Sequence, residues 1–327
     1  MAIMTLDDRI GKDLDEIYND KIVPLQKIID FAKKYNTFNL TEAANLLSSN
    51  LFGNTGEVIA TRGVPSFFVG NRNAETVMVM LNPGQDVALA NNPISTYDRI
   101  IRGNKIGKGI KINSLKDFID TYKVDSEYYG EIDVNRLDNF DLKQAAFLKP
   151  WVGCGVIIKD FLDPGYEKLG NDEKNEIHKE AKKNVLMQKL SLELIPYASR
   201  KFEGINTNNI AILFPFLETV FHEIFRKERK YVIFCSNFYE ELFNQYNNWK
   251  ERLWDIDILT KQSSNAVFNQ KQGKKNRLAY CTPIKIKDGN GKTQKAIIAH
   301  TFPNRSLSNA YEKMKDYGEF CYDVWNK

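Results

Sequence analysis

The sequence has few of the features that define several large protein classes. It contains four cysteines, Cys154, Cys235, Cys281 and Cys321, and no two are close enough to form a C-x-x-C pair. A disulfide framework or a structural zinc site is therefore not expected, and each cysteine is predicted to be buried and reduced. No apolar run approaches the roughly 20 residues of a membrane-spanning helix. The first residues turn acidic at once, unlike a signal peptide, so we expect a cytoplasmic protein with no membrane partner.

Three enzyme fingerprints are also missing from the chain. It has no G-x-S-x-G nucleophile elbow, no P-loop and no G-x-G-x-x-G segment. The glycine- and lysine-rich stretch at 102–109 lacks the Walker spacing and is interpreted as a loop near the site. These absences argue against an α/β hydrolase of the elbow type and against the common nucleotide-binding enzymes.

Composition and charge are those of a folded protein with a mildly basic surface. Of the 327 residues, 43% are hydrophobic and 12% aromatic, which is enough for a complete core. The formal net charge is +4. This charge permits a nucleic-acid partner without requiring one.

Short apolar runs alternate with helical patterns along most of the chain. The apolar runs occupy 66–70, 76–81, 190–195, 231–235 and 296–299, and helical patterns occupy 114–122, 173–186, 215–230 and the stretch from about 306 to 325. A hairpin turn is predicted at 288–291. The pattern predicts an α/β fold with a mainly parallel central sheet flanked by helices. Residues 1–57 are predicted to form a helical extension, and 58–327 a core with an insertion around 91–185.

The first candidate site follows the apolar run at 76–81. That run stops at Asn82-Pro83-Gly84, a rigid turn with exposed amides at the carboxyl end of a buried strand, where α/β sheets bind their ligands. Asn82 is placed to orient a water molecule, and Asp86 is a nearby candidate base. The alternative is a turn without further function, since Asn, Pro and Gly all favour turns.

The second candidate site begins at the end of the run at 296–299. The chain has only three histidines, and His178 and His222 lie within helical patterns, whereas His300 follows an apolar strand. A histidine in that place can donate a hydrogen bond to an oxyanion. Further along the same loop, Arg305 and Leu307 are a basic contact and an apolar wedge. The alternative is a polar loop in which Ser306 or Ser308 caps the last helix.

A carboxylate and a polar segment follow the run at 190–195. Glu193 interrupts this apolar strand, and an unpaired buried carboxylate is costly, so it needs a partner or lines a pocket. Tyr197 and Ser199 follow Glu193 in the same polar segment and are candidates for the same pocket. A buried salt bridge is the alternative reading.

Basic residues gather just before His300. Residues 271–295 contain one acidic residue, Asp288, against eight lysines and arginines, of which Lys274, Lys275 and Arg277 are grouped most tightly. Such a cluster beside a site suggests contacts to DNA phosphates. A solvated basic hairpin is the alternative.

Taken together, these segments resemble the uracil-DNA glycosylase superfamily. Residues 79–84, Val-Met-Leu-Asn-Pro-Gly, are similar to the G-I-N-P-G motif of its mismatch-specific branch, and residues 300–308 to its H-P-S-P-L-S motif. The segments Leu81–Gly84 and Glu193–Ser199 also resemble a bacterial and phage group with L-N-P-G and E-x-x-P-Y-x-S. The asparagine that reads uracil in the superfamily has no clear match here, and its iron–sulfur cysteine pattern is absent.

The resemblance implies a monofunctional DNA glycosylase that needs no metal or other cofactor and acts as a monomer. Asn82 would orient the water and His300 would stabilise charge on the departing base, with Pro83, Gly84, Tyr197 and Ser199 in the pocket. Arg305, Leu307 and Ser308 would contact or enter the DNA. The target nucleotide would be flipped out and stacked on an aromatic ring, with Tyr97, Phe147 and Trp151 as candidates.

The departures from the motif bear on substrate and activity. Glu193 would suit a base edge that offers an amino group, as cytosine does, so the target is uracil or a modified base such as those of phage DNA. The role is then repair or anti-phage defence. The alternative is a catalytically inactive glycosylase-like module that only binds DNA.

Overall fold

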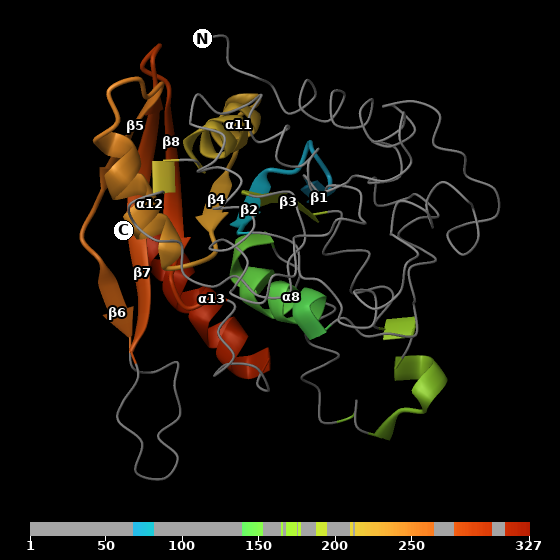
Figure 1. Cartoon of the computed structure of the whole chain (residues 1–327). Coiled ribbons are helices and arrows are strands. Elements are labelled where there is room, and N and C mark those ends of the chain that lie inside the picture. The colour runs from blue at the N-terminus through green and yellow to red at the C-terminus, as the bar shows by residue number, and fades with distance from the viewer. Residues whose placement is uncertain are drawn as a thin grey trace, which may run out of the picture. The chain divides into compact units, whose positions relative to one another are not determined.

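The computed structural model describes residues 68–81, 139–152, 165, 168–174, 176–177, 188–194, 210–211, 213–264, 278–302 and 311–327 (Figure 1). The chain divides into two compact units. One unit consists of residues 1–69, 79–132 and 192–227, and the other of 70–78, 133–191 and 228–327. The predicted extension at 1–57 and the helix expected at 114–122 lie outside the described residues.

The described strands form one mixed sheet with the order β1-β3-β2-β4-β8-β7-β5, and β6 pairs with β7. The strands are β1 (Phe68–Gly70), β2 (Thr76–Met80), β3 (Lys189–Glu193), β4 (Tyr231–Phe234), β5 (Trp254–Ile258), β6 (Gln262–Ser264), β7 (Ala279–Asp288) and β8 (Thr293–Ala299). β4 and β8 are parallel, whereas β7 is antiparallel to β5, β6 and β8. The N–H groups of Lys230 and Tyr231 donate to the Glu75 carbonyl oxygen, so β2 and β4 begin side by side, as parallel neighbours do.

The predicted α/β class is confirmed. The helices are α8 (Asn139–Val152), α11 (Phe214–Phe225), α12 (Phe238–Asn247) and α13 (Tyr311–Asn326). Every residue of β2 and β4 is buried, as expected for strands of a sheet covered on both faces. Helix α8 falls within the predicted insertion, yet it packs against α13 in the second unit (Figure 1). In the part of the chain that is described, no helix has the length and apolarity needed to cross a membrane.

The predicted hairpin at 288–291 is confirmed as the β7–β8 turn. The Asp288 carboxylate accepts hydrogen bonds from the backbone N–H groups of Asn290 at 3.0 Å and Lys292 at 2.8 Å. Gly291 has a φ of 85°, a conformation that glycine adopts at little cost. The turn fixes the register in which Thr282 lies opposite Ile298 and Cys281 opposite Ala299.

The alternation of side chains in this hairpin separates two layers. Tyr280, Thr282 and His300 share the face on which α12 lies, because the residues of a strand point alternately to its two faces. Cys281 lies on the other face, where its side chain meets Cys321 of α13. Cys235, Cys281 and Cys321 are buried, as predicted, and Cys154 is outside the described residues.

Candidate functional site

Most of the residues predicted to form the site lie outside the described part of the chain, and their roles stay predictions. These residues are Asn82, Pro83, Gly84, Asp86, Tyr97, Tyr197, Ser199, Lys274, Lys275, Arg277, Arg305, Leu307 and Ser308. The strand that leads to the first of them is confirmed, since β2 ends at Met80 and the description stops one residue later. The predicted residues that are described are Glu193, His300 and two of the stacking candidates, Phe147 and Trp151.

Glu193 ends its strand rather than interrupting it. β3 runs from Lys189 to Glu193, and Glu193 is half-buried whereas the four residues before it are buried. The prediction that Glu193 lies inside a longer apolar strand is therefore wrong, because Glu193 is the last residue of β3. A strand terminus costs a carboxylate less desolvation than the middle of a buried strand. Its proposed role in reading a base stays a prediction.

Phe147 and Trp151 are not available to stack on a flipped base. Phe147 is 0% and Trp151 3% exposed, and both lie on α8. The ring centroid of Phe147 lies 5.1 Å from that of Phe302, and the centroid of Trp151 lies 5.2 Å from those of Tyr231 and Tyr322. These rings belong to the core that joins α8 to α13, so the prediction that either one stacks on the substrate is wrong.

His300 follows β8 directly, as predicted, and its ring is almost enclosed. Its side chain is 5% exposed. Its backbone N–H donates to the Tyr280 carbonyl oxygen at 3.3 Å, which extends the β7–β8 pairing by one residue. The strand register thus fixes the direction in which the imidazole points.

Both ring nitrogens of His300 face polar partners. Nε2 lies 2.7 Å from Oγ1 of Thr282, and Nδ1 lies 3.5 Å from Oε2 of Glu240. The same Glu240 oxygen forms an ion pair with Nζ of Lys261, 2.6 Å away. The four side chains therefore form a row that runs from the buried strand β7 through the imidazole to a partly exposed ion pair.

Helix α12 holds Glu240 in this row because its far end is bound to the edge strand β5. Asn247 donates to the Ile256 carbonyl oxygen at 2.7 Å and accepts the Ile256 N–H at 3.1 Å. The hydroxyl of Tyr246 accepts the N–H of Leu253 at 3.1 Å. These bonds satisfy edge-strand backbone groups and fix the helix that carries Glu240.

The surroundings of His300 favour its neutral form. Burial, and to a smaller extent the positive charge of Lys261, lower the pKa of His300 from 6.5 to about 4, although the Glu240 carboxylate acts in the opposite direction. A neutral imidazole offers one N–H donor and one acceptor nitrogen. At neutral pH the ring is therefore suited to donate a hydrogen bond to developing negative charge without carrying a charge itself.

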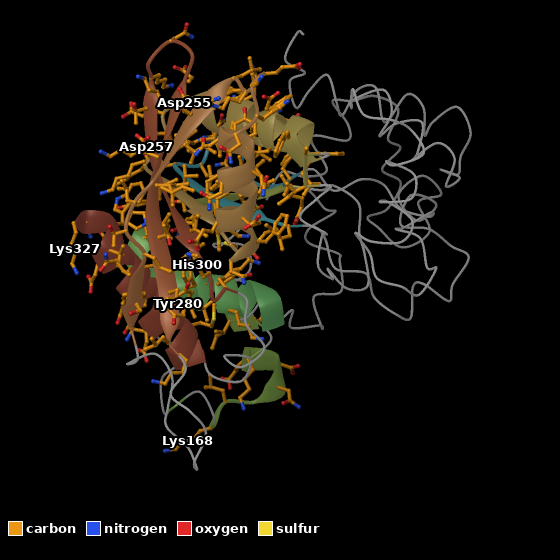
Figure 2. The ribbon with its side chains drawn as sticks, turned by 60° about the vertical axis from the view of Figure 1, so that its left-hand side comes forward. Lys168, Asp255, Asp257, Tyr280, His300 and Lys327 are labelled. Carbon is orange, nitrogen blue, oxygen red and sulfur yellow. The ribbon has the colours of Figure 1, made fainter. Side chains whose placement is uncertain are left out.

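An exposed aromatic ring lies beside the histidine. Tyr280 is 38% exposed, and its ring meets that of His300 edge-on with centroids 6.5 Å apart (Figure 2). Nζ of Lys261 lies 5.6 Å from the centre of the Tyr280 ring. A flat apolar surface and a cation thus lie next to the imidazole, a combination suited to a nucleobase and its phosphate.

Tyr317 of α13 supports this end of the hairpin from the opposite face. Its hydroxyl donates to the Tyr280 carbonyl oxygen at 2.6 Å and accepts the Thr301 N–H at 2.9 Å. Tyr317 is 0% exposed. The hydroxyl therefore links the backbone of Tyr280 in β7 to the backbone of Thr301, which follows His300.

Replacing Tyr317 by phenylalanine is expected to lower the free energy of unfolding by about 1–3 kcal/mol, because a buried N–H and a buried carbonyl lose a partner. Urea unfolding followed by circular dichroism measures the change. Tyr280→Phe is the matched control, because that ring is partly exposed. Equal effects of the two substitutions would contradict a structural role for the Tyr317 hydroxyl.

No protein-family model, no curated protein and no solved structure matches this chain. Within the described ranges, no group of three or more His, Cys, Asp or Glu side chains is arranged to hold a metal ion. What the structure defines is an α/β protein with a buried neutral histidine at the carboxyl end of a strand. Its function is inferred from that site and from the sequence motifs.

Proposed function

We propose that this protein is a DNA glycosylase that hydrolyses the N-glycosidic bond of a flipped uracil or modified base, in repair or in anti-phage defence. The observation that carries the proposal is the site at the end of β8. There a neutral, nearly enclosed His300 lies beside the exposed ring of Tyr280 and the ammonium of Lys261. The Asn82-Pro83-Gly84 segment after β2 supports it from the sequence.

The chemistry assigns a separate task to each group. The nucleotide leaves the stack because its glycosidic bond is unreachable there. Tyr280 replaces Phe147 and Trp151 as a surface for a base, and Tyr97 stays a candidate. As the C–N bond breaks, its electron pair leaves with the base, and the N–H of His300 donates to the oxygen on which charge develops. Water oriented by Asn82 and deprotonated by Asp86 adds to the sugar carbon, and the proton taken up by Asp86 then passes to the departed base through solvent. The products are an abasic site and a free base, with no cofactor consumed.

Release of bases from a panel of DNAs tests the proposal. Single- and double-stranded DNAs carrying uracil, a thymine mismatch or a modified cytosine are incubated with the protein, and alkali then cleaves at abasic sites. We expect Asn82→Ala to lower release roughly 100-fold, because general acid–base and water-positioning groups contribute at least that much, and to leave DNA binding nearly unchanged. Asn290→Ala, in the exposed β7–β8 turn, is the matched control and should keep full activity.

The outcomes separate the proposal from its alternative. Release that depends on Asn82 establishes the activity and identifies the base. Binding to DNA without release from any substrate favours the inactive glycosylase-like module. If the protein neither releases a base nor binds DNA, both the glycosylase and the inactive DNA-binding module are contradicted.

A further inference from the structure

We propose that the ribbon formed by β6 and the adjoining end of β7 binds an unpaired nucleic-acid strand, with a base stacked on Tyr280 and a phosphate held by Lys261. Figure 1 shows this ribbon extending beyond α12. That the strand is DNA and carries the target base rests on the proposed function, whereas the binding surface does not.

A β-bulge places Lys261 on the face of the ribbon toward α12. β5 pairs with β7 up to Ile258, and the pairing resumes in β6 at Gln262, so the three residues 259–261 lie opposite only two residues of β7. The extra residue shifts the alternation of side chains by one, because neighbouring residues of a strand point to opposite faces. In the register of β5, Lys261 would lie opposite Cys281, on the face that α13 covers.

Pro283 of β7 lies opposite this bulge and suits it. A proline has no N–H to donate to a neighbouring strand, and within sheets it is confined largely to edges and bulges. One bond remains at the bulge, from the N–H of Leu259 to the Pro283 carbonyl oxygen at 3.0 Å. Bulges that re-aim a side chain are common beside active sites. The local sequence thus builds a fixed position for Lys261.

Exposed side chains form a strip along this face of the ribbon. Ser263 is exposed and lies opposite Tyr280. Leu278 precedes Tyr280 by two residues, the spacing at which strand residues share a face. Tyr280 is 38% and Leu278 39% exposed, and they are two of the four large hydrophobic side chains exposed in the described part of the chain. Apolar side chains that gather in one exposed strip mark an interaction surface.

The strip combines an aromatic ring with a cation. Nζ of Lys261 lies 5.6 Å from the centre of the Tyr280 ring. Glu240 pairs with this ammonium, but an ammonium has three donors and the Lys261 side chain is 41% exposed, so donors remain for a phosphate. Base stacking on aromatic rings together with cations along the backbone is the general means by which single strands are bound.

Length and charge favour an unpaired strand over a duplex. From Thr282 to Leu278, β7 spans roughly 13 Å, several times the roughly 3.4 Å between successive nucleotides of one strand. The bases of a duplex are already paired and stacked, so they offer no face to a surface of this length. Residues 265–277, between the two strands of the ribbon, carry four basic residues and no acidic one. Their charge is complementary to a polyanion.

Binding of a labelled oligothymidylate of about 12 nucleotides, followed by fluorescence anisotropy, tests the surface. This probe contains no uracil or modified base, so binding is measured without base release. We expect it to bind at least tenfold more tightly than an adenine–thymine duplex of the same length. Tyr280→Ala should weaken binding about tenfold, whereas Tyr280→Phe, which keeps the ring, should not. Lys261→Gln should weaken binding and lower the slope of log affinity against log salt by about 0.7, the value for one phosphate of a single strand.

Two further variants separate the position of the lysine from its charge. The double variant Lys261→Gln with Gln262→Lys keeps the net charge but moves the ammonium to the other face, and it should bind as weakly as Lys261→Gln. Lys285→Gln removes a lysine that is exposed on the opposite face of β7, and it should bind like the wild type. Circular dichroism confirms that each variant is folded.

The results distinguish this inference from the proposed function. Equal or tighter binding of the duplex overturns the inference, as does unchanged binding by a folded Tyr280→Ala, or an equal loss in Lys285→Gln and Lys261→Gln. Binding of oligothymidylate that depends on the Tyr280 ring, with no base release from any DNA, supports the surface and contradicts the glycosylase activity. Base release by a protein whose oligothymidylate binding does not depend on Tyr280 supports the activity and overturns the surface.

Discussion

Replacing Gly318 by alanine is expected to lower the free energy of unfolding by about 3 kcal/mol, at the upper end of the usual cost of overpacking. Gly318 lies in α13 where that helix meets α8. An added Cβ would lie 2.0 Å from the carbonyl oxygen of Phe147, 2.8 Å from its carbonyl carbon and 3.0 Å from its Cα. Because these are backbone atoms, no rotation of a side chain relieves the clash. The gain in helix propensity, about 1 kcal/mol for alanine over glycine, is too small to compensate.

Gly289→Ala is the matched control for this substitution. A Cβ at Gly289, in the β7–β8 turn, would have no heavy atom within 4 Å. Gly289→Ala should change the free energy of unfolding by no more than about 1 kcal/mol. Urea unfolding of the wild type and both variants, followed by circular dichroism, measures the difference. Equal midpoints for the two variants would contradict the close approach of α13 and α8.

The strands of the sheet could be predicted from sequence because their signals are local. β2 and β4 are uninterrupted apolar runs, and both are buried throughout. The β7–β8 turn was recognisable from its Asp-Gly-Asn-Gly sequence. β5 was missed although its residues Trp-Asp-Ile-Asp-Ile alternate with period two, matched by alternate burial of Trp254 and Ile256.

Helix α8 was missed for a physical reason. Residues Gln144 to Leu148 are all buried, so the helix has no polar face over that stretch and no period of 3.6 to detect. Pro150 lies inside it, which in a sequence usually marks the end of a helix. The helix is stabilised by tertiary packing against α13, which a local sequence pattern does not show.

The site was predictable only in part. His300 could be found because a rare residue type follows an apolar strand. Glu240 and Thr282 lie 60 and 18 residues before it, and no local pattern connects the three. Their meeting depends on the register of β7 with β8 and on how α12 returns across the sheet. Both are long-range features that a single sequence does not specify.

The buried histidine should give the protein a characteristic loss of stability in acid. The pKa of His300 falls from 6.5 to about 4 on folding, chiefly through burial. A group whose pKa is lower in the folded state contributes stability that is present above pH 6.5 and is lost as the pH falls toward 4. A shift of this size corresponds to about 3 kcal/mol of stability lost by pH 4, since each unit is worth about 1.4 kcal/mol. The sign follows because only the unfolded chain binds the proton readily in this range.

His300→Gln is expected to remove this loss. Carboxylates also titrate between pH 6.5 and 4, so the measured quantity is the difference between the urea-unfolding free energies of the wild type and the variant at several pH values. That difference should favour the wild type most above pH 6.5 and shrink by about 3 kcal/mol by pH 4. Gly289→Ala, which keeps the histidine, should follow the wild-type curve. If the His300→Gln difference is the same at pH 7 and pH 4, folding does not lower the pKa of the imidazole, and its surroundings do not hold it in the neutral form that the proposed chemistry uses.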